Sequence, residues 1–157
     1  MKSKTLLTLA VAMLLAGTAL AQAQESVYGT WKVNFAKSEY SPGPAPTSSM
    51  AKWEAFQGGV KLTADVVPAK GEPQHWESSG KFDGKDHPVK GNNPDADMVA
   101  FSKIDAHTYE TVSKKGGKIT LTAHIVVAAD GKTRITTQTG KDAQGRTIHN
   151  SSFYEKQ

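Results

Sequence analysis

The last predicted strand, residues 147–155, carries polar side chains suited to recognising a small molecule. Every second side chain of a strand points to the same face. One face of this strand holds an amide, a hydroxyl and a phenol, those of Asn150, Ser152 and Tyr154. The preceding strand, residues 133–139, can add the guanidinium of Arg134 to the same wall. Buried polar groups cost about 1–3 kcal/mol each unless they are hydrogen bonded. This face therefore lines a wet ligand cavity or, if Phe153 points inward instead, is the outer face of the sheet.

Two tryptophans are further candidates for ligand contacts. Trp53 and Trp76 lie in runs with few other large apolar residues. Aromatic walls with a few polar groups are typical of small-molecule sites, although tryptophans of this kind often belong to the core. The predicted ligand-binding residues are Trp53, Trp76, Arg134, Asn150, Ser152 and Tyr154.

Metal and catalytic motifs are absent from the sequence. The five histidines, at positions 75, 87, 107, 124 and 149, lack the close spacing of a zinc or copper motif, and there is no cysteine. No nucleophile elbow, zinc-protease helix or phosphate-binding glycine loop is present. We therefore expect no metal, no cofactor and no catalytic residue, and an enzyme with an unfamiliar site ranks third among the interpretations.

Period-two alternation predicts that strands position these side chains. Apolar residues alternate with polar ones from 27 to 35, from 60 to 66 and from 119 to 127, which indicates half-buried strands. Less regular runs lie at 50–57, 74–82, 98–104, 108–113, 133–139 and 147–155, with a tenth at 87–90. Glycine pairs and Asp-Gly steps between them, such as Asp83-Gly84 and Asp130-Gly131, are typical of tight hairpins.

Short links between strands predict an all-β fold, an antiparallel up-and-down meander of nine or ten strands. Closing the sheet into a barrel hides both edges, whereas a two-sheet sandwich, the second choice, usually needs longer crossing connections. The one long irregular segment, residues 38–49, contains three prolines that disfavour strand pairing. We expect it to be a stiff surface connection or a lid over the barrel mouth.

The first 23 residues have the pattern of a secretory signal peptide. Lys2 and Lys4 precede an uncharged run rich in leucine and alanine, and small residues follow in Ala-x-Ala spacing. Cleavage is predicted after Ala23, with a cut after Ala21 or an uncleaved anchor as alternatives. Residues 24–157 then form one domain, exported to the periplasm or secreted.

The charge of the chain does not favour nucleic acid or a membrane surface as a partner. The formal net charge is +4, and Lys2 and Lys4 supply two of these charges, which leaves about +2 for residues 24–157. Both signs are scattered along the chain, as on an ordinary solvated surface. The sequence indicates no particular protein partner.

The two ends of the predicted barrel resemble those of the calycin superfamily, the lipocalins and fatty-acid-binding proteins. Gly29-Thr30-Trp31-Lys32 is similar to a family opening, and Phe153-Tyr154-Glu155-Lys156 is similar to a closing strand. The resemblance implies a lipocalin-like barrel with Trp31 as a core plug. Fatty-acid-binding proteins hold the ligand carboxylate with an arginine two residues before the terminal tyrosine, where this chain has Ser152. Their helical pair has no counterpart here, and the opening of haem-binding relatives does not match.

The chain also looks like the small lipocalin-like proteins that bacteria export, a group that implies no defined activity. We therefore expect an exported, non-catalytic protein that binds an apolar or amphiphilic small molecule. The alternative is a structural or interaction protein of the cell envelope, with a filled barrel and no ligand. The volume of the barrel interior separates the two interpretations.

Overall fold

Short turns connect the successive strands from residue 48 onward, and each of these strands pairs antiparallel with the strand that follows it. The computed structural model describes residues 24–157. The strands are β1 (Gly29–Val33), β2 (Glu39–Ser41), β3 (Ser48–Phe56), β4 (Gly59–Val67), β5 (Gln74–Gly80), β6 (Asp83–Gly91), β7 (Met98–Lys103), β8 (Thr108–Lys115), β9 (Lys118–Val127), β10 (Thr133–Lys141) and β11 (Thr147–Lys156). A 3₁₀ turn, η1 (Phe35–Lys37), links β1 to β2. No helix in this part of the chain is long and apolar enough to span a membrane.

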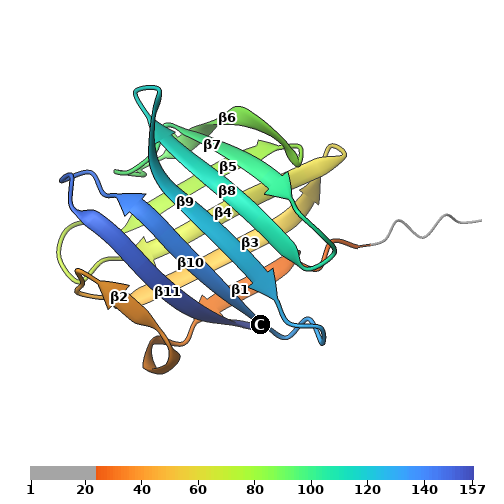
Figure 1. The fold of residues 1–157 in the computed structure, drawn as a ribbon, viewed down its shortest axis with the longest axis horizontal. Helices are drawn as coiled ribbons and strands as arrows, with labels where there is room; N and C mark the ends of the chain where they lie inside the picture. The colour runs from red at the N-terminus through yellow and green to blue at the C-terminus, as the bar shows by residue number, and fades with distance from the viewer. Residues whose placement is uncertain (1–23) are drawn as a thin grey trace, which may run out of the picture.

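The sheet closes into a barrel because β1 pairs with both β3 and β11 (Figure 1). Ten strands form the ring, and β2 is an eleventh that pairs with β11 alone. The edge of β11 is therefore shared, with β1 opposite its C-terminal half and β2 opposite its N-terminal half. Residues 42–47 run from β2 to β3 at the same end of the barrel as the β10–β11 turn.

The predicted fold class, an all-β antiparallel meander closed into a barrel, is confirmed, and the sandwich alternative is wrong. The uncertain tenth run at 87–90 is part of β6, which is longer than the sequence indicated. The predicted signal peptide, residues 1–23, lies outside the described residues and remains a prediction.

Three local predictions need correction. The strand predicted at 27–35 is only Gly29–Val33, because the chain turns before Gly29 and again at η1. The segment predicted to be irregular, 38–49, contains β2 and the start of β3. Ile119, predicted to be buried, is 64% exposed, because the β8–β9 pairing shifts register between Ser113 and Lys114.

Trp31 lies at the seam between β1 and β11 and is fully buried, in agreement with the core-plug prediction. Its indole Nε1 donates a 2.8 Å hydrogen bond to the carbonyl of Val27. Nζ of Lys156 stands 5.0 Å from the ring centroid. A Cβ at Gly29 would collide with the Lys156 side chain, so glycine leaves room for this cation to lie across the indole.

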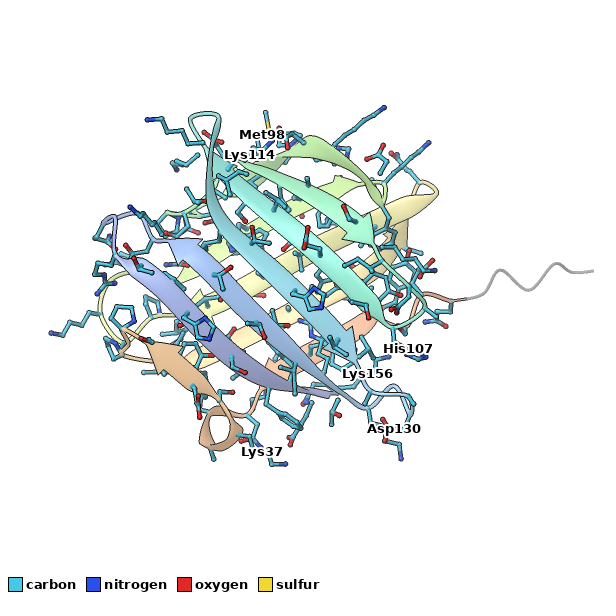
Figure 2. All side chains as sticks on the ribbon, viewed as in Figure 1. Lys37, Met98, His107, Lys114, Asp130 and Lys156 are labelled. Atoms are coloured by element: carbon cyan, nitrogen blue, oxygen red, sulfur yellow. The ribbon has the colours of Figure 1, made fainter. Side chains whose placement is uncertain are left out.

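The end of the barrel opposite residues 42–47 is closed by the segment that precedes β1. The hydroxyl of the fully buried Tyr109 donates to the carboxylate of Glu25 at 2.8 Å and accepts from the backbone N–H of Ser26 at 3.1 Å. Lys103 forms a 2.7 Å ion pair with the same carboxylate. Charged side chains such as Lys114 and Asp130 lie at the outer surface (Figure 2).

Replacing Tyr109 with phenylalanine should weaken this closed end. The ring keeps its packing while Glu25 and Ser26 lose their buried partner, so the free energy of unfolding should fall by about 1–2 kcal/mol. Urea unfolding followed by circular dichroism measures the change. Glu25→Gln in the Tyr109→Phe background should cost less than it does alone, and equal costs in both backgrounds would show that the two groups are not coupled.

Candidate functional site

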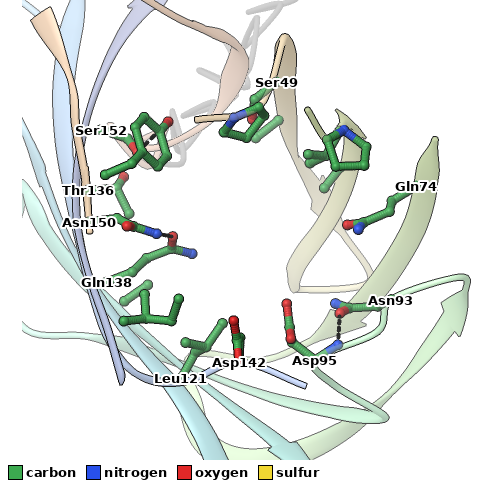
Figure 3. Close-up of a pocket in the computed structure, with 18 of the residues that line it drawn as sticks. Ser49, Gln74, Asn93, Asp95, Leu121, Thr136, Gln138, Asp142, Asn150 and Ser152 are labelled. Atoms are coloured by element: carbon green, nitrogen blue, oxygen red, sulfur yellow. Dashed lines mark hydrogen bonds between the residues drawn. The ribbon is translucent and has the colours of Figure 1, made fainter. Parts of the chain in front are cut away.

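The barrel encloses a cavity of about 430 Å³ that opens at the end covered by residues 42–46. Small-molecule sites typically measure about 300–1,000 Å³. The opening is bordered by the prolines of the β2–β3 segment, by the β6–β7 loop and by the β10–β11 loop. Figure 3 shows this opening, with side chains arranged around an empty centre.

One wall of the cavity is polar and is formed by the facing strands β10 and β11. Their register pairs inward residues directly across from one another: Arg134 with Tyr154, Thr136 with Ser152, and Gln138 with Asn150. All six line the cavity, and we call them the polar ladder. Each facing pair is one rung of this ladder, and the two upper rungs are those nearer the opening, Thr136 with Ser152 and Gln138 with Asn150. Figure 3 shows the two upper rungs on one side of the opening.

The wall around the polar ladder is apolar. Inward side chains of β3, β4 and β9 alternate with outward polar ones and line the cavity as Ala51, Leu62, Ala64, Leu121, Ala123 and Ile125. Trp53 and Trp76 add aromatic surface from β3 and β5. A bound molecule would therefore meet hydrocarbon on one side and hydrogen-bonding groups on the other.

Arg134 is the only charged residue among the fully or nearly fully buried residues of the described chain, at 3% exposed. Its guanidinium carbon lies 4.9 Å from the Trp31 ring centroid and 4.4 Å from that of Tyr154. Within residues 24–157 no carboxylate forms an ion pair with it, and Nε and Nη1 have no hydrogen-bond partner. Burial lowers the pKa of Arg134 to about 10, with Tyr154 opposing the shift, so the group still carries its charge at neutral pH.

The structure brings together all six residues that the sequence predicted to contact a ligand. Arg134, Asn150, Ser152 and Tyr154 belong to the polar ladder, and Phe153 points outward, with Lys37 Nζ 4.8 Å from its ring centroid. The two tryptophans, Trp53 and Trp76, line the cavity and also pack in the hydrophobic core. Whether these residues contact a ligand remains a prediction.

Tyr40 is a cavity residue that the sequence did not indicate. It lies on β2, in the segment predicted to be irregular, and accepts a 2.9 Å hydrogen bond from Ser152. Burial raises the pKa of Tyr40, although the bond from Ser152 opposes this effect. No sequence pattern signals β2, because three residues are too few to show alternation.

Two carboxylates, those of Asp95 and Asp142, were also missed, and they lie side by side at the cavity opening (Figure 3). Asp95 accepts a 2.8 Å hydrogen bond from the backbone N–H of Ala143, which ties the β6–β7 loop to the β10–β11 loop. Burial raises the pKa of Asp95, the bond from Ala143 lowers it, and the charge of Asp142 raises it again, with a net upward shift. Burial would raise the pKa of Asp142, but the hydrogen bonds that Arg146 donates from its backbone and its side chain oppose this effect, with a net downward shift.

Residues 24–157 contain no group of three or more side chains placed to hold a metal ion. No known protein family, no curated protein and no solved structure matches the chain. The assignment of a function therefore depends on the geometry of the cavity.

Replacing Arg134 with methionine tests whether the guanidinium stabilises the fold. Methionine fills similar space against Trp31 and removes a buried charge that lacks an ionic partner, so the free energy of unfolding should be unchanged or larger by up to about 2 kcal/mol. Chemical unfolding measures it, with Lys156→Met as the control that removes the exposed cation on the same indole. A loss of 2 kcal/mol or more in Arg134→Met alone would show that the arginine serves the fold.

Replacing Asp95 with asparagine should stabilise the barrel at neutral pH. A raised folded-state pKa means that the folded protein binds this proton more tightly than the unfolded chain does, so ionised Asp95 costs stability above that pKa. Asparagine keeps an acceptor for Ala143 without the charge, and the melting temperature at pH 7 should rise by about 2 °C.

The advantage of Asp95→Asn should shrink as the pH falls through the folded-state pKa, because wild-type Asp95 then becomes neutral as well. Thermal unfolding between pH 3.5 and 8 follows this difference. Asp130→Asn is the control, because Asp130 caps a turn at the other end of the barrel through the backbone N–H of Lys132. A pH-independent difference for Asp95→Asn would contradict the assigned cause.

Proposed function

We propose that this chain is a non-catalytic binding protein that holds a small amphiphilic acid inside the barrel. The observation that carries the proposal is Arg134, a buried cation that lines the cavity and has two nitrogens, Nε and Nη1, without hydrogen-bond partners. A buried charge is costly unless it is paired and hydrogen bonded. A ligand carboxylate would supply both the opposite charge and the missing acceptors.

The depth of Arg134 determines how such a ligand would lie. Arg134 is near the start of β10, close to Trp31, whereas the cavity opens near the end of β10, at the β10–β11 loop. An acid would therefore enter head first and leave its hydrocarbon against Leu62, Ala64 and Ile125. This orientation places the charged head away from the Asp95 and Asp142 carboxylates at the opening.

The size of the cavity favours binding over the interaction-protein alternative. A filled barrel would leave no space inside, whereas the cavity measures about 430 Å³. An outward apolar row, Val126, Ile135 and Phe153 on adjacent strands, is the feature that favours a protein partner. Because Lys37 lies over Phe153 and leaves only two residues of this row uncovered, we rank that function second.

We further propose that the barrel is lipocalin-like and that the protein acts outside the cytoplasm. The first proposal is supported by the ten-stranded ring and by Trp31 at the seam of its first and last strands. The second is supported by the charge and hydropathy pattern of residues 1–23. A ligand that enters from the periplasm or the medium would fit both.

Calorimetric titration with decanoate and with decanamide tests the proposed function. The two probes have similar shape, but only decanoate carries a charge that pairs with Arg134, so it should bind at least tenfold more tightly, about 1.4 kcal/mol. In Arg134→Met the affinity for decanoate should fall to that for decanamide.

Lys156→Met is the matched control for this titration. It removes the other cation beside Trp31 without changing the cavity, and it should leave both affinities as in the wild type. Equal binding of decanoate and decanamide by the wild type, or no binding of either, would refute an acid ligand.

A further inference from the structure

The upper rungs of the polar ladder have hydrogen-bonding capacity that the protein itself does not use. Thr136 Oγ1 is buried and has no partner. Asn150 donates to Gln138 across a long 3.5 Å contact. Ser152 donates a 2.9 Å hydrogen bond to Tyr40, and the amide oxygen of Asn150 accepts a 3.2 Å hydrogen bond from the backbone N–H of Ser41. Buried polar groups in native proteins usually have a partner, so these groups indicate contact with water or with a ligand.

The rungs are regularly spaced between Arg134 and the cavity opening. Inward residues of one strand are two positions apart, which corresponds to about 6.8 Å. The rung of Thr136 and Ser152 is therefore one such step from Arg134, and the rung of Gln138 and Asn150 is two steps away. A molecule anchored at Arg134 and extending to the opening must pass both rungs.

A plain hydrocarbon chain would fit this wall poorly. It would displace water from Thr136, Gln138 and Asn150 and give no hydrogen bond in return, which lowers affinity. The wall across the cavity, with Leu62 and Ala64 of β4, would suit it well. The two walls together match a molecule with one polar edge and one apolar edge.

We propose that the ligand is an acid with hydroxyl or amide groups along one edge, rather than an unsubstituted fatty acid. This inference rests on the proposed function, because the carboxylate at Arg134 sets the register of the molecule against the ladder. The first polar substituent lies beside Thr136 and Ser152, and a second lies beside Gln138 and Asn150. Hydrocarbon on the other edge packs against β3 and β4.

The test compares decanoate with decanoates that carry one hydroxyl group, at carbon 3, 5 or 9, in calorimetric titrations. A hydroxyl group on carbon 5 of an extended chain lies about 5 Å from the carboxylate carbon and about 6 Å from its outer oxygen, close to the spacing of the rungs. This isomer should bind the wild-type protein about 3- to 10-fold more tightly than decanoate, the gain expected from one additional hydrogen bond.

Thr136→Val removes the unpartnered hydroxyl and keeps the shape of the side chain. Its affinity for decanoate should be equal to or above that of the wild type, while the preference for the 5-hydroxy isomer should disappear. The matched control is Thr137→Val, a threonine on the outward face of the same strand that does not line the cavity. It should retain the wild-type preference, and circular dichroism should show that both variants are folded.

The outcomes separate this inference from the proposed function. Decanoate binding that depends on Arg134, with no gain from any hydroxyl group, overturns the polar-edge ligand and leaves the acid-binding function in place. A gain that persists in Thr136→Val overturns the assignment to this rung. If no acid binds, both proposals fall together. A gain for the 5-hydroxy isomer that Thr136→Val abolishes and Thr137→Val retains supports the inference.

Discussion

Closure of the barrel depends on the seam where β1 meets β11, and Trp31 stands at this seam between two cations. Lys156 lies near the indole from the end of β11, and Arg134 lies near it from β10. Only Arg134 lines the cavity. Trp31 therefore lies both at the seam that closes the ring of strands and beside Arg134, the charged residue that is buried in the interior. This arrangement links the closure of the fold to the chemistry of the site.

The interior of this barrel is costly to maintain without a ligand. A guanidinium with two nitrogens that lack partners, together with the unpartnered hydroxyl of Thr136, would be replaced by leucine or valine if stability alone shaped the wall. Stabilising contacts are concentrated elsewhere, in the Tyr109–Glu25 closure and in the apolar packing around Phe101. Four of the seven buried polar atoms without partners in residues 24–157 belong to cavity-lining residues, Trp53, Arg134 and Thr136, and such a concentration is typical of a functional site.

Much of the barrel and of its polar wall could be predicted from the sequence, because period-two alternation fixes which side chains share a face. Arg134, Asn150, Ser152 and Tyr154 were placed together in this way. The bulge that exposes Ile119 could not be predicted, since one residue out of register leaves the composition unchanged. The three-residue β2 forms through its pairing with β11, and the hydrogen bond from Ala143 to Asp95 joins two loops across 48 positions of the sequence. These features depend on tertiary contacts that have no local pattern.

The position of the charge in this cavity differs from the position expected from the resemblance of the chain's ends to fatty-acid-binding proteins. In that pattern an arginine stands two residues before the terminal tyrosine, where this chain has Ser152, one rung nearer the opening than Tyr154. Here the cation is on β10, directly across from Tyr154. The charge is therefore deeper in the barrel, and the rungs above it are neutral and polar. A head group bound at Arg134 would draw the rest of the molecule past those rungs, so the shift of one charged residue changes which part of a ligand the wall can recognise.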